Sequence, residues 1–424
     1  MFETHSHTYG NGVRFLRVVA PLHMATVHVS VGVGSRHEDA KVAGIAHLSE
    51  HVRFRGTRRF PTGAAVNSAF DVSGGDHNAV TGSESMSFYA SALPEEIPAV
   101  AGLVADLVAH PLFRKEELEQ ERPVVLQEIS TRRSAVEEMV ATTIFGTHPT
   151  ARPVPGTRAT VSKIQATHLE EHHHTYFVGP NVVVVVVAPA EISTEALIDA
   201  LGTLAELPAV TPPPTLPFEG HEAPYRVRHV TGEVTTPNVT LVYPSCGHRA
   251  PEAMLTSMLV ASLERISGPV FQRLRHELGL LYHYDVASFQ VAEGGGLIVQ
   301  YRVSSADIVR ATHEMLTLLH RLGSGPEGLP AEAFEATKKS SLTWAARLCD
   351  NSEELASFYA SELLWGSHRT PAEWVRELGT ATVPAVSQRA AEIFREHHVR
   401  LITSGTVSPR LRAQLRALLS KEDA

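Results

Sequence analysis

A proline-rich segment near the middle of the chain limits the fold more than any other feature of the sequence. Residues 207–224, LPAVTPPPTLPFEGHEAP, contain six prolines. Proline has no N–H to donate and its ring clashes with the preceding helical turn, so neither a helix nor a central strand can run through this segment. The segment therefore predicts an interdomain linker, which divides the 424 residues into one domain at 1–210 and a second at 222–424.

Both parts of the chain begin with a strand and continue with a long helix. TVHVSVGVGS at 26–35 and NVTLVYPS at 238–245 alternate valine or leucine with small polar residues, which is typical of strands. Helical spacing of apolar residues follows at 41–55 and at 251–266. Strands that alternate with helices predict an α+β fold in which each domain has a sheet covered by helices. Further helical patterns occupy 95–110, 115–145, 306–322 and much of 331–363.

Composition narrows the class of protein and its partners. Hydrophobic residues make up 43% of the chain and charged residues 20%, as in globular proteins. The longest apolar run, VVVVVVAPA at 182–190, is too short to cross a bilayer and suits a buried strand. A formal charge of −9 argues against a nucleic-acid partner. The N-terminal MFETHSHTYGNGVRF has no basic segment followed by an apolar one, so it does not resemble a secretory signal. We expect no membrane partner.

The cysteines and tryptophans are expected to have no catalytic or metal-binding role. Cys246 and Cys349 are the only cysteines and lie far apart without a CxxC pattern, so neither a disulfide framework nor a cysteine zinc site is expected. A reducing, cytoplasmic location fits this usage. The three tryptophans lie in segments of the second half that have helical patterns, and we expect them to be core or interface anchors: Trp344, Trp365 and Trp374.

The segment GIAHLSEHVRFRGT at 44–57 contains a pattern suited to metal chemistry. On a helix, His47 and His51 stand one turn apart on the same face, the spacing that lets two imidazoles bind one metal ion. Glu50 projects near that face, where a carboxylate can act as general base towards water activated by the metal. This HxxEH order is the inverse of the HExxH zinc motif. A pair of exposed histidines on a surface helix would have the same sequence pattern. A third ligand is therefore needed to distinguish a metal site from such a pair.

Two glutamates downstream are candidates for that ligand. EQERPVVLQEIS at 119–130 places Glu121 and Glu128 seven residues apart, and therefore on one face of a helix. One carboxylate could bind the metal while the other holds a ligand in position. A glutamate-rich helix with a solvated face has the same pattern, and these residues by themselves leave both interpretations open.

Taken together, these segments resemble the pitrilysin/insulinase-type zinc peptidases, or inverzincins, which include mitochondrial processing peptidase. The interval of 77 residues from His51 to Glu128 is similar to the spacing in that family. The resemblance covers almost the whole chain, and departures such as Val52, Ala188 and His276 remove no catalytic group. Four more blocks are similar in order: SGGDHNAVTGSESMSFYASALPE at 73–95, GTHPTARPVPGT at 146–157, VGPNVVVVVVAPAEIS at 178–193 and FQRLRHELGLLY at 271–282.

The resemblance implies a fold and a metal site. It implies two homologous domains, each with a mainly antiparallel sheet covered by helices. The first would be the catalytic domain, with Zn²⁺ bound by His47, His51 and Glu128. Glu50 would be the general base, and Glu121 would support the site by orienting a ligand or stabilising charge.

The resemblance also implies residues that bind the substrate. Asn78 and Ala79 would lie on a sheet edge that receives the peptide as an added strand. The second domain would contribute Arg275 and Tyr282. Tyr282 would donate a hydrogen bond to the oxyanion, and Arg275 would hold a substrate carbonyl or carboxylate.

The function that this resemblance implies is a zinc metalloendopeptidase that hydrolyses leader, presequence or precursor peptides. Because chains of this length have two such domains rather than four, the enclosing chamber would need a second chain, in a homodimer or a heterodimer. One alternative is the catalytic subunit of an obligate heterodimer whose partner lacks zinc. The other is a non-catalytic assembly or scaffold subunit of the same fold.

Overall fold

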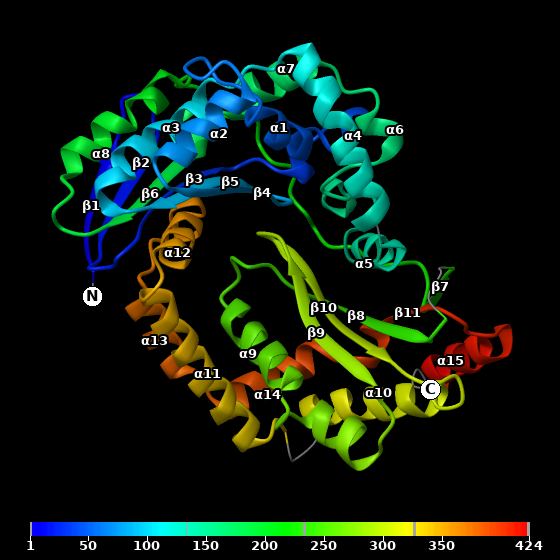
Figure 1. Cartoon of the computed structure of the whole chain (residues 1–424). Helices are drawn as coiled ribbons and strands as arrows, with labels where there is room; N and C mark the ends of the chain where they lie inside the picture. Colours follow the sequence, from blue (N-terminus) through cyan, green and yellow to red (C-terminus); the bar gives the residue numbers. More distant parts are fainter. Residues whose placement is uncertain (1, 133, 232–234, 325–327, 422–424) are drawn as a thin grey trace. The chain divides into compact units, whose positions relative to one another are not determined.

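The computed structural model describes residues 2–132, 134–231, 235–324 and 328–421 (Figure 1). Its contacts divide the chain into two units, each built mainly from one half of the sequence together with a segment from the other half. Unit 1 comprises Met1–Arg133, Arg152–Leu216 and Trp344–Trp374, and unit 2 comprises Ser134–Ala151, Pro217–Thr343 and Val375–Ala424.

Unit 1 contains a sheet in the order β1-β2-β6-β3-β5-β4. Its neighbouring strands are antiparallel except for β2 and β6, which run parallel. Strand β4 is therefore at one edge of the sheet, next to β5 alone. The strands are β1 (Glu3–Thr8), β2 (Arg14–Val19), β3 (Ala25–Val31), β4 (Asp76–Thr81), β5 (Met86–Ala92) and β6 (Val182–Ala188).

The valine run is the central strand β6, and all of its residues are fully buried. Val182, Val184 and Val186 belong to the core that includes helix α3 (Ile97–Ala109). The alternate residues Val183, Val185 and Val187 pack with helix α12 (Ser352–Leu364) on the opposite face. Because side chains alternate across a strand, cover on both faces explains a continuous apolar run.

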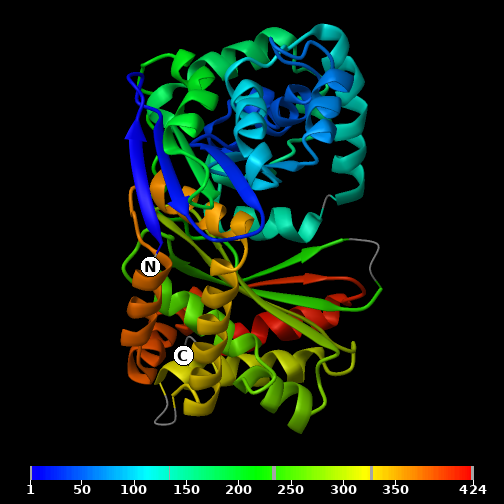
Figure 2. The ribbon, with the colours of Figure 1, turned by 60° about the vertical axis from the view of Figure 1, so that its left-hand side comes forward.

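In each unit, one face of the sheet is covered by a helix that comes from the other half of the chain. Helix α12 packs on the sheet of unit 1, as Figure 2 shows in orange beneath the blue strands. Helix α5 (Ala135–Phe145) packs on the sheet of unit 2, where Val140, Ile144 and Phe145 join its core. The helix expected at 115–145 is consequently two helices, α4 (Lys115–Arg132) in unit 1 and α5 in unit 2.

Unit 2 repeats the strand arrangement of unit 1. Its order β7-β11-β8-β10-β9, counted along the chain, is first, fifth, second, fourth, third, as it is for β2 to β6. In both sheets the first and fifth strands are the parallel pair. This confirms the predicted α+β fold of two similar, mainly antiparallel domains. The strands are β7 (Val227–Val230), β8 (Asn238–Cys246), β9 (His283–Gln290), β10 (Gly294–Arg302) and β11 (Arg400–Ser404).

Most of the remaining helices pack against a strand or against another helix. Helices α11 and α13 pass from one unit to the other along the chain. Within the described residues, no helix is both long and apolar enough to cross a membrane. These helices are α1 (Ile45–Arg53), α2 (Gly63–Val72), α6 (Arg158–Val161), α7 (Ala166–Tyr176), α8 (Thr194–Ala200), α9 (Ala253–Glu264), α10 (Ile308–Ser324), α11 (Ala331–Cys349), α13 (Pro371–Thr380), α14 (Val383–Ile393) and α15 (Pro409–Lys421).

Candidate active site

Helix α1 carries the HxxEH motif, and a buried carboxylate holds its N-terminus. Glu38 Oε2 accepts a hydrogen bond from the Gly44 N–H at 2.7 Å, and Oε1 accepts one from the Ala46 N–H at 2.9 Å. The first N–H groups of a helix have no partner within the helix, so this side chain satisfies two of them. Burial raises the pKa of Glu38 to about 8.

Two glycines from separate sequence blocks meet at the start of α1. Gly44 has φ +95°, and a Cβ there would lie 2.6 Å from the Pro155 carbonyl oxygen. Gly156 has φ +73°, and its Cβ would lie 2.3 Å from the Ala43 carbonyl oxygen. Only glycine combines left-handed backbone with so close an approach. The loop after α5 therefore packs directly against the first turn of the motif helix.

A fully buried arginine fixes the other end of α1. The Arg53 guanidinium donates to the carbonyl oxygens of Leu107 and Val108, at the C-terminus of α3, at 3.0 Å each. Its carbon also lies 3.6 Å from the centre of the Phe177 ring, within the range of a cation–π contact. Helix α1 is thus held at both ends, so its side chains occupy fixed positions.

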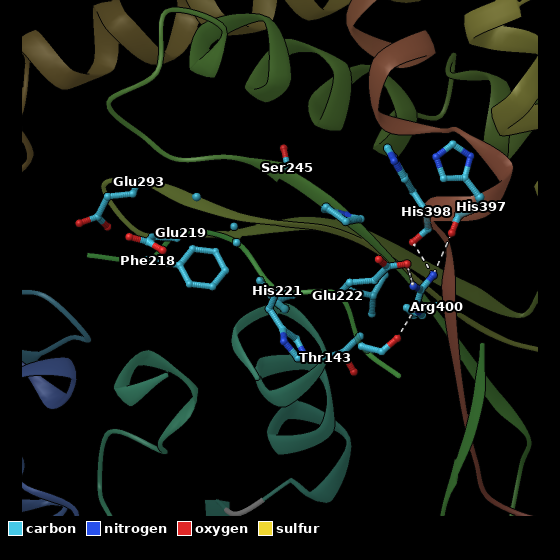
Figure 3. A pocket seen from close by; sticks show the side chains of 17 residues that line it. Thr143, Phe218, Glu219, His221, Glu222, Ser245, Glu293, His397, His398 and Arg400 are labelled. Carbon is cyan, nitrogen blue, oxygen red and sulfur yellow. Dashed lines mark hydrogen bonds and ion pairs between the residues drawn. The ribbon is translucent and has the colours of Figure 1, made fainter. Parts of the chain in front are cut away.

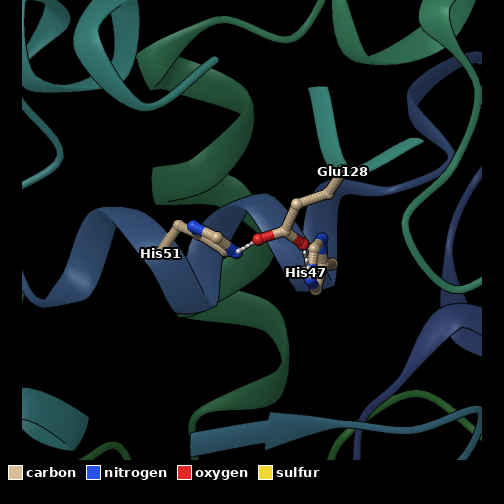
Figure 4. A group of neighbouring side chains, drawn as sticks. All are labelled: His47, His51 and Glu128. Carbon is tan, nitrogen blue, oxygen red and sulfur yellow. Dashed lines mark ion pairs between the residues drawn. The ribbon is translucent and has the colours of Figure 1, made fainter. Parts of the chain in front are cut away.

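The structure brings His47, His51 and Glu128 together, with one ligand atom from each lying within 4.8 Å of the others (Figure 4). His47 Nε2 is 3.6 Å from Glu128 Oε2, and His51 Nε2 is 3.9 Å from Glu128 Oε1. Ligands about 2.1 Å from a tetrahedral zinc ion are about 3.4 Å apart, so small side-chain movements suffice. Two imidazole nitrogens and a carboxylate oxygen are a donor set that fits Zn²⁺ and leaves one position open.

Glu121 contacts the other ring nitrogen of His51. Its Oε2 lies 3.1 Å from His51 Nδ1, and its Oε1 accepts from Arg55. Burial would raise the pKa of Glu121, but the hydrogen bonds from His51 and Arg55 hold it below its usual value. When a metal is bound at Nε2, the proton of His51 would lie on Nδ1, and Glu121 is placed to accept a hydrogen bond from it.

Replacing Glu121 by glutamine is expected to weaken zinc affinity about 10- to 100-fold, since the amide is a weaker acceptor for His51 and loses the ion pair with Arg55. Competition with a fluorescent zinc chelator measures this affinity. Glu119→Gln on the same helix is the matched control, because it also removes a carboxylate that is paired with an arginine, Arg122. Equal zinc affinity in the Glu121 variant and the wild type would contradict the supporting role.

Glu50 is placed beside the cluster by the sheet edge. Its carboxylate accepts a hydrogen bond from the Thr81 hydroxyl, at the end of β4. Burial raises the pKa of Glu50, and the nearby Glu128 charge adds to this, against opposite effects of Thr81 and His51. A raised pKa brings a carboxylate closer to the range suited to a general base.

Strand β4 places Asn78 and Ala79 at the sheet edge beyond Glu50. In this strand the residues alternate between exposed and half-buried, with Asn78 exposed. The Ala79 N–H donates to Asn78 Oδ1 at 2.8 Å. An incoming strand would compete with this side chain for an N–H at the edge. The role of both residues in peptide binding stays a prediction.

Arg275 and Tyr282 lie in unit 2 and contact each other. Arg275 belongs to a π-helix, Phe271–Glu277, a rare conformation that is frequent at functional sites. Its Nη1 donates to the backbone carbonyl of Tyr282 at 2.7 Å and to that of Leu281. The Tyr282 side chain is 66% exposed. Because the metal cluster belongs to unit 1, a joint role of these residues stays a prediction.

A cavity of about 500 Å³ in unit 2 lies where the linker meets the sheet (Figure 3). Within it the Arg400 guanidinium donates to Glu222 Oε1 at 2.8 Å and to the Ala223 carbonyl at 3.0 Å. The ring of Phe218 packs edge-on against Phe145 at a centroid distance of 5.0 Å. These contacts fasten the linker, and the metal-type cluster found among the described residues is elsewhere, in unit 1.

Several contacts of the site are not apparent in the sequence motifs. Arg55 and Thr81 lie within the quoted blocks, so their place in those blocks was the available signal. Glu38 carried no signal, because an isolated glutamate before a helix is usually exposed. Trp344 is 43% exposed, so it is not a core anchor, and the alternative expectation of an interface anchor stays a prediction.

Comparison with known proteins identifies two family models along the chain. A model described as Insulinase (Peptidase family M16) matches residues 16–158, which include the three cluster residues and Glu50. A model described as Peptidase M16 inactive domain matches residues 163–341.

Relatives and solved structures agree with these matches. A protein named as an uncharacterized zinc protease of Mycobacterium tuberculosis is 31% identical, covering 97% of this chain and 96% of its own. The uncharacterized zinc protease YmxG of Bacillus subtilis is 26% identical, covering 94% and 97%. The crystal structure of a protease from Helicobacter pylori has a TM-score of 0.84 at 17% identity, covering 96% of this chain and 100% of that chain. At that identity the likeness concerns the fold.

Proposed function

We propose that the chain, which belongs to the insulinase family of peptidases (peptidase family M16), is a zinc-dependent endopeptidase. The observation that carries the proposal is the convergence of His47, His51 and Glu128 on one point, with Glu50 one residue before His51. Two imidazoles, one carboxylate and an adjacent base are the set that hydrolysis at a metal requires.

The residues divide the chemical work between them. Zinc, when bound, would polarise water and the peptide carbonyl. Glu50 would take the proton of the attacking water and pass it to the leaving amine, with Thr81 orienting its carboxylate. Glu121 would keep His51 in the tautomer that binds the metal.

The peptide would bind as an extra strand on the edge of β4. An edge strand offers unpaired backbone groups, so hydrogen bonds to the peptide backbone supply affinity that depends little on the side chains. Thr81 ends the same strand and contacts Glu50, so a peptide on β4 would pass close to the base. Leader, presequence and precursor peptides are the proposed substrates.

In this proposal Arg275 and Tyr282 assist the reaction from the second domain of a partner chain, in a homodimer that encloses the peptide. The presence of both the metal set and this pair in one chain supports a homodimer. The alternative is an obligate heterodimer whose second subunit lacks zinc. The expected cytoplasmic location also stays a prediction.

A non-catalytic assembly role is the second candidate. The model described as an inactive domain matches residues 163–341 and gives this candidate its support. Against it, the four residues required for the chemistry are all present in the part that matches the insulinase model, residues 16–158.

Removing the metal tests the proposal. We expect the purified chain to cleave members of a peptide library, and to lose this activity when a chelator removes zinc, because no other group in the cluster activates water. Mass spectrometry of the products measures cleavage, and re-adding zinc should restore the same products. Cleavage that persists after complete zinc removal, or no cleavage at all by the zinc-loaded chain with or without other cellular proteins, would contradict the proposal.

A further inference from the structure

A cavity of about 510 Å³ adjoins the exposed edge of the unit 1 sheet. It lies on the face of the sheet that α12 covers, and it is lined from β3, β4, β5, α11 and α12. Its apolar walls are formed chiefly by aromatic rings, and its polar groups include two carboxylates. The lining residues used below are Val80, Tyr89, Trp344, Phe358, Glu353 and Glu354.

The walls of this pocket remain accessible to solvent. Trp344 is 43% exposed and Val80, on β4, is 54% exposed. The Tyr89 ring stacks on His28, which also lines the pocket, with centroids 5.4 Å apart and planes 6° from parallel. His28 Nδ1 is buried and has no hydrogen-bond partner among the described residues. Exposed aromatic rings beside an unpartnered buried polar atom indicate a ligand-binding surface.

The pocket also contains two carboxylates, of Glu353 and Glu354, that have no ion-pair partner among the described residues. Glu353 and Glu354 occupy the first turn of α12, where the Asn351 side chain already accepts from their backbone N–H groups at 2.9 and 3.0 Å. Neither carboxylate forms a hydrogen bond or an ion pair within the described parts of the chain. Acidic residues in a first turn stabilise a helix, but that role does not require aromatic rings in the lining of the same cavity.

The pocket is connected to the candidate active site through Tyr89. Burial, and then the charge of Glu353, raise the pKa of Tyr89, and the charge of Glu50 adds to the same effect. The Asn78 side chain also hydrogen-bonds to Tyr89. Tyr89 therefore interacts electrostatically with both Glu50 and Glu353 of the pocket.

The geometry of a sheet relates this pocket to a bound peptide. Side chains alternate between the faces of a sheet, so a peptide added to β4 would place every second side chain on the face that α12 covers. Val80 points to that face, because it lines the pocket, and it precedes the Thr81 that holds Glu50. A substrate side chain near the scissile bond can therefore reach the pocket.

We propose that this pocket is a specificity subsite that takes an arginine or lysine side chain of the substrate. The aliphatic stem would pack on Val80 and Phe358, the cation would lie over Trp344 or Tyr89, and Glu353 with Glu354 would neutralise its charge. The proposal rests on the proposed peptidase function, because it assumes a peptide on β4. It adds the side chain that the enzyme selects.

Peptide binding tests the subsite separately from cleavage. The zinc-loaded Glu50→Gln variant is titrated with fluorescent peptides in which one arginine is exchanged for citrulline, a neutral side chain of the same shape, at successive positions. We expect about tenfold tighter binding of the arginine peptide at one position and not at its neighbours, since one charge-assisted contact is worth about a factor of ten. Adding Glu353→Gln and Glu354→Gln should abolish this preference.

A matched pair of glutamates supplies the control. Glu170 and Glu171 are adjacent and exposed on α7, and neither lines the pocket, so Glu170→Gln with Glu171→Gln removes the same charge and should keep the tenfold preference. Trp344→Ala, an exposed position, is a second pocket variant and should reduce the preference without changing citrulline binding.

The outcomes separate the two proposals. Equal binding of arginine and citrulline peptides at every position, no binding of either, or a preference that survives both pocket variants would overturn the subsite. Arginine-selective binding that disappears in the pocket variants supports it, even if the wild type cleaves no peptide. In that case the peptidase function would fail while the subsite remained. Chelator-sensitive cleavage without an arginine preference would support the peptidase function and contradict the subsite.

Discussion

Glu50→Gln is expected to retain zinc and to lower kcat for peptide cleavage by about 10³-fold, within the range that general-base catalysis contributes. The reason is that glutamine keeps the shape of the side chain but cannot take a proton from water. His47, His51 and Glu128 are unchanged, so the metal should stay bound. Because Thr81 donates to the carboxylate, the amide oxygen can accept the same hydrogen bond and the local structure should persist.

Two measurements on the same samples check this expectation. Zinc content per chain is measured by elemental analysis, and kcat is measured with a peptide found in the library screen. Glu119→Gln, an exposed glutamate on α4, is the control for loss of one negative charge and should keep both values. If Glu50→Gln cleaved at the rate of the wild type, Glu50 would not be the base. If it lost zinc, its activity would carry no information on that assignment, and Glu50→Asp would replace it.

Mixing two inactive variants should restore activity if one homodimer shares each site between two chains. Glu50→Gln removes the base, and Arg275→Ala with Tyr282→Phe removes the proposed pair from the second domain. In an equal mixture, about half of the dimers contain one chain of each variant. In such a hybrid, one site has Glu50 from one chain and the Arg275/Tyr282 pair from the other, so all of its groups are intact. About one quarter of the wild-type activity should therefore return, from two preparations that are each nearly inactive.

The controls distinguish the three arrangements of subunits. A chain carrying all three substitutions should restore nothing when mixed with Glu50→Gln, because no site then has an intact base. Absence of restoration with the two separate variants, in a wild type that is active alone, would mean that each site is completed within one chain. A wild type that is inactive alone but active after a different subunit is added would establish the heterodimer.

The sequence was sufficient to predict the broad architecture, for reasons that are local. Six prolines at 207–224 exclude regular structure whatever surrounds them, and hydrophobic periodicity reports which faces are buried. The valine run was recognisable as a buried strand. The sequence did not indicate that its second face would be covered by α12, because a helix 164 residues further on (188 to 352) leaves no mark on the strand that it covers.

The same distinction applies to the site. The one-turn spacing of His47 and His51 and the two-turn spacing of Glu121 and Glu128 are properties of helices, so the sequence determined which side chains share a face. That the two helices face each other, so that Glu128 lies 3.6 Å from His47, is decided by packing between segments distant in the chain.

The sequence by itself therefore determined the division into two α+β domains and the residue types for the metal chemistry. Only the tertiary structure decided that α5 and α12 are exchanged between the units, that Glu38 holds the start of α1, and that Trp344 faces a pocket with Glu353 and Glu354. The physical reason is the range of the forces involved. Helical hydrogen bonds and side-chain periodicity involve residues a few positions apart, whereas strand pairing and packing join segments that only the complete chain brings into contact.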